Sequence, residues 1–147
     1  MKSKIIYLLF SFLLISCNFN QFYKDRESDK EDGEKIPQKF YWELRYGANQ
    51  DTIYKLFDEK FFAVTDQEKL LELINTTQNN IGPVQEYNLV KWETLVVKGS
   101  NARSQYFFMY NVKRGTETTE ESFNLEKDKD GNIKIVGYRV NQTFSNK

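Results

Sequence analysis

The side chains available for chemistry in this 147-residue chain are carboxylates and phenols. There is no histidine and only one cysteine, so composition excludes a Ser-His-Asp triad, a Cys-His pair, a histidine-ligated metal and an intrachain disulfide. None of the remaining acids or phenols belongs to a recognisable catalytic motif, so no catalytic or cofactor-binding residue is predicted. The available groups are Glu43, Asp58, Glu59, Glu86, Glu93, Tyr41, Tyr46, Tyr87, Tyr106, Tyr110 and Tyr138.

One short segment resembles a calcium-binding loop, because acids alternate ahead of a glycine in Asp128-Lys129-Asp130-Gly131. If Gly131 held the sixth position of such a loop, the twelfth position would be Gly137, and the bidentate glutamate that completes the loop would be missing. The same residues suit a hairpin turn between two alternating segments. We therefore predict a turn here, with no metal ion and no other cofactor.

Aromatic residues make up 16% of the chain, so large rings are the main material for a core. Residues 106–110 (YFFMY) would present large side chains on both faces of a strand. One face must be core, and the other is either covered by helices, lines a ligand cavity or forms a partner surface. The predicted core residues are Leu44, Phe57, Leu70, Ile74, Phe108 and Phe123. The candidate ligand-binding or partner-binding aromatics are Trp42, Tyr46, Trp92, Tyr106 and Tyr110.

The N-terminus has the layout of a signal peptide, with two lysines followed by the apolar residues 5–15 (IIYLLFSFLLI). As a helix this segment would span roughly 16 Å, about half of a hydrocarbon core, which is short for a membrane-spanning helix. It ends in Leu14-Ile15-Ser16-Cys17, which resembles the lipobox of bacterial lipoproteins. The resemblance implies that residues 1–16 are removed, and that Cys17 receives a diacylglyceryl group and often a further acyl chain such as palmitate. An ordinary secretory signal or a signal anchor is the alternative.

Residues 18–35 carry many charges of both signs and almost no aliphatic side chains, so we predict that they do not order. Residues 17–35 would then be a lipidated cysteine and a flexible charged tether. With a root-mean-square reach of roughly 25 Å, the tether would hold the folded domain, residues 36–147, clear of the lipid head groups. Alternatively, residues 24–27 (KDRE) are part of an export or sorting signal.

The domain is predicted to be α+β, with helices first and a sheet second. Apolar residues at helical spacing predict helices that begin near Pro37, near Asp51 and at Thr65 or Asp66, with a brief extended segment at residues 61–64. After Pro83 the period changes to two and predicts four strands, at residues 84–98, 105–114, 117–127 and 133–141, joined by short turns. We therefore expect three helices packed on a curved four-stranded antiparallel meander, with a bend or bulge in its long first strand.

This order of elements resembles the nuclear transport factor two-like, or cystatin-like, superfamily, in which the sheet curls round the helices as a cone. The chain looks closest to small bacterial lipoproteins of unknown function, through Leu56-Phe57 and residues 61–65 (FFAVT) and 134–138 (KIVGY). The resemblance implies a cone-shaped domain but no particular activity. The superfamily includes isomerases, dehydratases, hydrolases, ligand binders and partner-binding subunits.

We predict a lipid-anchored protein of the bacterial cell envelope, on the periplasmic face or the cell surface. Its partners would be the membrane, through the N-terminal lipid, and an envelope protein or a small apolar ligand bound without catalysis. The alternative is a small hydratase, isomerase or hydrolase that uses a carboxylate or tyrosine in the cone. Basic and acidic side chains balance at 21 each without a basic cluster, so no nucleic-acid partner is expected.

Overall fold

The computed structural model describes residues 19–47, 49–115 and 117–142, so the predicted signal peptide and Cys17 lie outside the described residues. Five strands form one antiparallel sheet in the order β1-β2-β3-β4-β5. The described elements are β1 (Gln21–Lys24), α2 (Glu27–Trp42), the π-helical turn η2 (Glu43–Gly47), α3 (Gln50–Tyr54), α4 (Glu59–Phe62), α5 (Gln67–Asn80), β2 (Val84–Lys98), β3 (Arg103–Arg114), β4 (Glu117–Lys127) and β5 (Ile133–Gln142).

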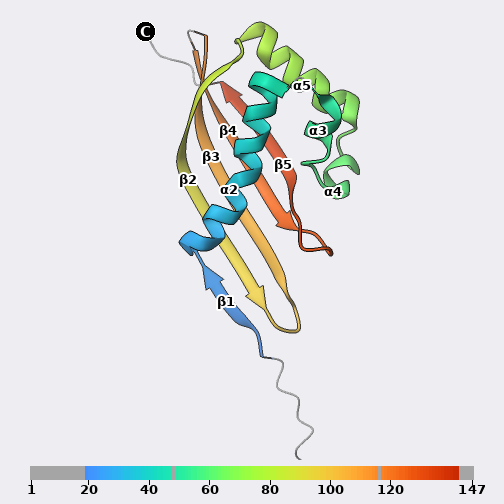
Figure 1. Ribbon diagram of the computed structural model, residues 1–147, viewed down its shortest axis with the longest axis vertical. Helices are drawn as coiled ribbons and strands as arrows, with labels where there is room; N and C mark the ends of the chain where they lie inside the picture. The colour runs from blue at the N-terminus through green and yellow to red at the C-terminus, as the bar shows by residue number, and fades with distance from the viewer. Residues whose placement is uncertain (1–18, 48, 116, 143–147) are drawn as a thin grey trace, which may run out of the picture.

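The helices in the described part of the chain lie on one face of the sheet (Figure 1). Helix α2 runs along the strands, and α3, α4 and α5 gather at one end of the molecule. The strands alternate accordingly: in β3, Tyr106, Phe108 and Tyr110 are buried under the helices, whereas Phe107 and Met109 point to the opposite face and stay partly exposed. The predicted α+β class and the antiparallel meander from residue 84 onward are confirmed, as are irregularities in the long strand β2.

Aromatic rings from α2 fill the space between the helix layer and the sheet. Phe40 is fully buried and meets Phe123 and Tyr138 edge-on, with ring centroids 5.4 and 5.0 Å apart. Tyr41 stacks on Tyr87 at 4.5 Å. Edge-on and stacked ring pairs of this kind add a favourable interaction to the free energy gained by burying their apolar area. Five of the six predicted core residues are buried, and Leu44 is partly buried against the same cluster.

The helices differ from the prediction in number and position. Pro37 lies inside α2 rather than at its start. Residues 61–64, predicted to be extended, include the last turn of α4, which Asp58 caps by accepting a hydrogen bond from the Lys60 amide at 2.9 Å. The third predicted helix is confirmed as α5. Asp66 caps it, and its buried residues are Leu70, Ile74 and Thr77.

The predicted flexible tether is wrong for the described residues 19–35. Strand β1 pairs with β2, with Gln21 opposite Lys98 and Lys24 opposite Leu95, and it makes a fifth strand where four were expected. Helix α2 begins at Glu27, ten residues before the predicted start at Pro37. The folded domain therefore includes almost all of the segment that had been assigned to the tether.

Candidate functional site

A buried charged group lies where β3, β4 and β5 come together, and we call it the Glu121 cluster: Arg114, Thr119, Glu121 and Tyr138. Arg114 is 1% exposed and Glu121 is 0% exposed. Both are polar residues on the helix-covered face of their strands, in line with Phe108 on β3 and Phe123 on β4.

Both carboxylate oxygens of Glu121 accept hydrogen bonds. Its Oε1 accepts from Arg114 Nε at 2.9 Å and Nη2 at 2.8 Å, and from the Thr119 hydroxyl at 2.9 Å. Its Oε2 accepts from the Tyr138 hydroxyl at 2.6 Å. Arg114 Nη1 also donates to the Gly82 carbonyl at 3.2 Å, just before β2. The cluster therefore connects three strands and the segment that leads into a fourth.

Tyr41 and Tyr110 are buried near this cluster, and Tyr138 is partly buried beside Glu121. Burial, and then the negative charge of Glu121, hold the pKa values of the Tyr138 and Tyr41 hydroxyls well above the usual phenol range. Burial, followed by the charge of Glu34, raises the pKa of Tyr110 in the same direction. The buried hydroxyls of Tyr41 and Tyr110 have no hydrogen-bond partner within normal distance. If either hydroxyl ionised, no hydrogen-bond donor would stabilise its negative charge.

These raised pKa values predict an alkaline limit to stability. Tyrosines ionise near pH 10 in an unfolded chain, but Tyr41, Tyr110 and Tyr138 stay neutral in the folded chain at that pH. Stability should be fully present below about pH 10 and should fall as the pH rises above it. Phenolate absorbance should show a late step that coincides with loss of circular dichroism. Ionisation of all tyrosines in a protein that stays folded would contradict this.

The arrangement of the Glu121 cluster fits a structural ion pair better than a catalytic base. A general base needs a free lone pair within reach of a substrate proton. Here both carboxylate oxygens are occupied by donors, and Glu121 lines neither of the two hollows described below nor a third one beside Ile133. Arg114 compensates the charge of the carboxylate. Because the bonds of the cluster connect β3, β4 and β5, its role is structural.

An open hollow of about 520 Å³ lies across the face of the sheet that the helices leave uncovered, and we call it the outer-face groove. The partly buried Phe107 ring is central to it, and Lys91 Nζ lies 5.6 Å from the ring centroid while pairing with Glu93 at 2.8 Å. At one side, Lys60 donates to Glu126 at 2.6 Å and lowers the pKa of that carboxyl. The lining residues are Lys24, Glu93, Thr94, Leu95, Gln105, Tyr106, Phe107, Asn124, Leu125, Glu126 and Val136.

A second hollow, of about 600 Å³, lies between α4 and the turn after β4, and its walls alternate lysines with acids. Asp128 accepts hydrogen bonds from the amides of Asp130 and Asn132 at 2.9 and 2.8 Å, and these bonds, that of Asn132 first, lower its pKa. The predicted hairpin turn is thereby confirmed. Among the described residues, no three acidic or cysteine side chains come together in a way that would hold a metal ion.

The structure brings two of the five predicted ligand-binding or partner-binding aromatics together on the surface. Trp42 and Tyr46 are both more than half exposed, and their ring centroids lie 6.0 Å apart, with the Arg45 guanidinium 5.1 Å from the Tyr46 ring. Trp92 is partly buried under Lys30, whose Nζ lies 5.5 Å from the ring. Tyr110 is buried in the core. Tyr106 is buried as well, at 4% exposure, but it contributes to the lining of the outer-face groove.

The candidate carboxylates are also dispersed. Glu43 is buried in η2, Asp58 caps α4, and Glu93 lies in the outer-face groove. Sequence reasoning missed Glu121 and Arg114, although the two-residue period of their strands places each of them on the face of a buried phenylalanine.

None of the helices in the described part of the chain has both the length and the apolar character needed to cross a bilayer. Comparison of the chain with protein-family models and with curated proteins finds no match in either case.

Proposed function

We propose that this protein is a lipid-anchored cell-envelope protein whose domain binds an envelope protein or a small ligand with an apolar face, without catalysing a reaction. The lipid anchor rests on the lipobox-like residues Leu14 to Cys17. The order of elements after β1, in which the helices come before strands β2 to β5, is compatible with the resemblance to the nuclear transport factor two-like superfamily. That superfamily includes non-enzymatic binding domains.

The outer-face groove is the observation that carries the binding proposal. Ligand sites combine an apolar surface with a few polar groups that fix orientation. Leu95, Phe107 and Val136 supply the apolar part, and Gln105 and Asn124 supply amide donors and acceptors. The only carboxylates that line the groove among the described residues are Glu93 and Glu126, and each is already paired with a lysine. The groove therefore supports recognition more strongly than acid–base chemistry.

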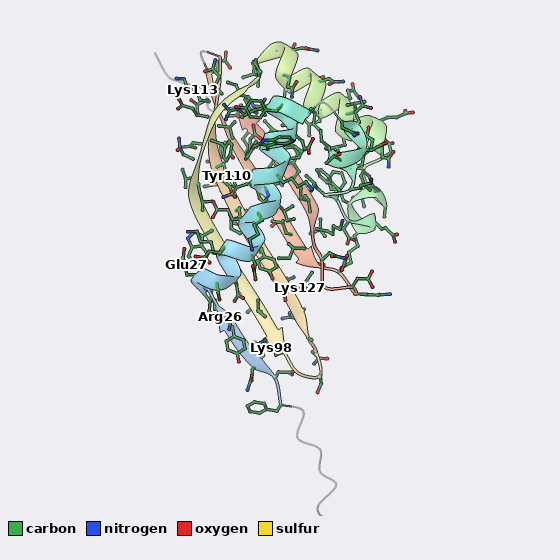
Figure 2. The ribbon with its side chains drawn as sticks, viewed as in Figure 1. Arg26, Glu27, Lys98, Tyr110, Lys113 and Lys127 are labelled. Carbon is green, nitrogen blue, oxygen red and sulfur yellow. The ribbon has the colours of Figure 1, made fainter. Side chains whose placement is uncertain are left out.

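Site-specific photocrosslinking in intact envelopes tests the binding site. A benzophenone side chain in place of Phe107 should give an adduct detectable by intact mass, which also separates a small ligand from a protein. The matched control is Lys113, which lies on the same strand and the same face but far along the sheet (Figure 2). Position 107 should give several times more adduct than position 113. Equal or absent labelling at the two positions would contradict binding in the groove.

The lipid anchor predicts a specific mature N-terminus. Mass spectrometry of the membrane fraction should find a chain that starts at Cys17 and carries acyl groups. Cys17→Ala should leave the precursor uncut, because the modified cysteine would be absent. Recovery of an unmodified Cys17 inside a longer chain would contradict the anchor, whereas the photocrosslinking result would still stand on its own.

A further inference from the structure

One end of the molecule carries exposed aromatic rings and basic side chains. We call it the hairpin end: residues 19–24, with β1, and residues 98–103, with the turn between β2 and β3. Phe19 is 70% exposed and Phe22 is 66% exposed. The charged side chains of residues 19–24 and 95–104 are Lys24, Lys98 and Arg103. Lys24, at the end of β1 away from the turn, lies 3.8 Å from the Asp25 carboxylate, so Lys98 and Arg103 are the cations closest to the turn.

The hairpin end is fixed to the rest of the fold. Strand β1 pairs with the last residues of β2, and the Asn101 amide donates to Asn20 Oδ1 at 3.2 Å across the turn. Gly99 has φ +130°, and a Cβ there would come within 2.3 Å of the Phe19 carbonyl oxygen. Only glycine suits that backbone, and it lets Phe19 pass directly against the turn. Phe19 and Asn20 therefore have a defined place on the surface of the domain.

This fixed place leaves a short connection to the lipid. Cys17 precedes Asn20 by three residues, and three residues span at most about 11 Å even when fully extended. The polar head-group layer is itself about 5 to 8 Å thick on each leaflet. A diacylglyceryl group on Cys17 would therefore keep the hairpin end at the head groups. The domain could not stand off from the membrane by the roughly 25 Å expected for a flexible tether.

We propose that the hairpin end is a membrane-contact surface, in which Phe19 and Phe22 enter the interface and Lys98 and Arg103 meet anionic head groups. This inference rests on the proposed lipid anchor. Exposed phenylalanines beside cations are the composition that suits the boundary between head groups and acyl chains. Each cation near an anionic surface strengthens binding by about fivefold. The outer-face groove includes Lys24, so its ligand would be bound close to the membrane.

Depth-dependent fluorescence in vesicles tests this contact. The full mature lipoprotein is reconstituted in phosphatidylethanolamine and phosphatidylglycerol vesicles that contain brominated lipid. Phe22→Trp should be quenched roughly twofold or more above the wild-type background of Trp42 and Trp92, since an interfacial ring enters the bilayer by about 5 to 10 Å. The matched control is Val64→Trp, because Val64 is 80% exposed but lies beyond α4, in the helix group away from the hairpin end. It should stay at the background.

A charge variant provides the second measurement. In the Phe22→Trp background, Lys98→Gln with Arg103→Gln should weaken the contact by up to roughly 25-fold. The quenching of the indole at position 22 should fall in anionic vesicles but not in zwitterionic ones. Lys113→Gln, at the opposite end of β3 from the hairpin end, should change nothing (Figure 2). Circular dichroism confirms that each variant is folded.

The two proposals fail in different ways. Mass spectrometry of the same preparation reports whether Cys17 is acylated. If it is acylated but the Phe22→Trp variant is quenched no more than the Val64→Trp variant, the membrane contact is overturned and the lipid anchor stands. If Cys17 carries no acyl group, the anchor is overturned and the geometric argument for the contact is lost with it.

Discussion

Replacing Glu121 by Ala is expected to lower the free energy of unfolding by about 3 to 5 kcal/mol, because the Arg114 guanidinium would stay buried without its counter-charge. Tyr138 and Thr119 would lose their acceptor at the same time. A domain of this size is stable by about 5 to 15 kcal/mol in total, so the variant would be marginal at physiological temperature. Urea unfolding followed by circular dichroism at low temperature measures the change.

Double substitution separates the cost of an unpaired charge from the value of the pair. Arg114→Met combined with Glu121→Leu removes both charges and keeps apolar volume, so it should be far less destabilising than either single change and should come within about 2 kcal/mol of the wild type. The matched surface control is Glu93→Ala, which removes an exposed partner of Lys91 and should change stability by less than about 1 kcal/mol. A Glu121→Ala variant as stable as Glu93→Ala would contradict the structural role of the cluster.

The sheet was predictable because its strands carry period-two patterns and are joined by short turns. The register between neighbouring strands keeps their apolar residues on the face that the helices cover. The same period places Glu121 two residues from Phe123 and two from Thr119, all on one face of β4. A carboxylate between buried residues on a strand is therefore a signal for an internal ion pair. The partner could not be identified from sequence, because the register of β3 and β4 places Arg114 opposite Glu117, and Arg114 reaches Glu121 along the sheet only through its long side chain.

The segment before Pro37 was misassigned because its contact with the core is made by a glycine. Gly33 is buried, and a Cβ there would lie 2.8 Å from the Tyr106 ring and 3.0 Å from the Phe108 ring. Helix α2 can approach β3 closely because position 33 has no side chain, so the contact leaves no apolar residue to detect. The charged residues visible in the sequence form local pairs instead, such as Lys30 with Glu27 at 2.7 Å and Lys35 with Asp32 at 2.9 Å. Such exposed pairs contribute little by themselves.

A chain that begins at Ile36 is therefore expected to lose most of its stability. It would lack β1 and the first half of α2, which cover Tyr106 and Phe108. Each ring is almost fully buried, and exposing a large apolar side chain costs about 1.5 to 3 kcal/mol, so uncovering two costs about 3 to 6 kcal/mol. The edge of β2 that includes Val96 and Val97 would also lose its partner strand and become open to association with other chains.

A series of start points assigns this loss to particular elements. A chain beginning at Asn18 keeps every described element and should unfold in one cooperative transition. A chain beginning at Arg26 loses β1 together with the Asp25 carboxylate, which accepts from the Thr94 amide at 2.9 Å, and should be intermediate in stability. Urea midpoints measured by circular dichroism should fall in the order Asn18, Arg26, Ile36. If the chain from Ile36 has the same midpoint as the chain from Asn18, residues 19–35 do not contribute to the fold, and the short connection between Cys17 and the domain is lost as an argument for membrane contact.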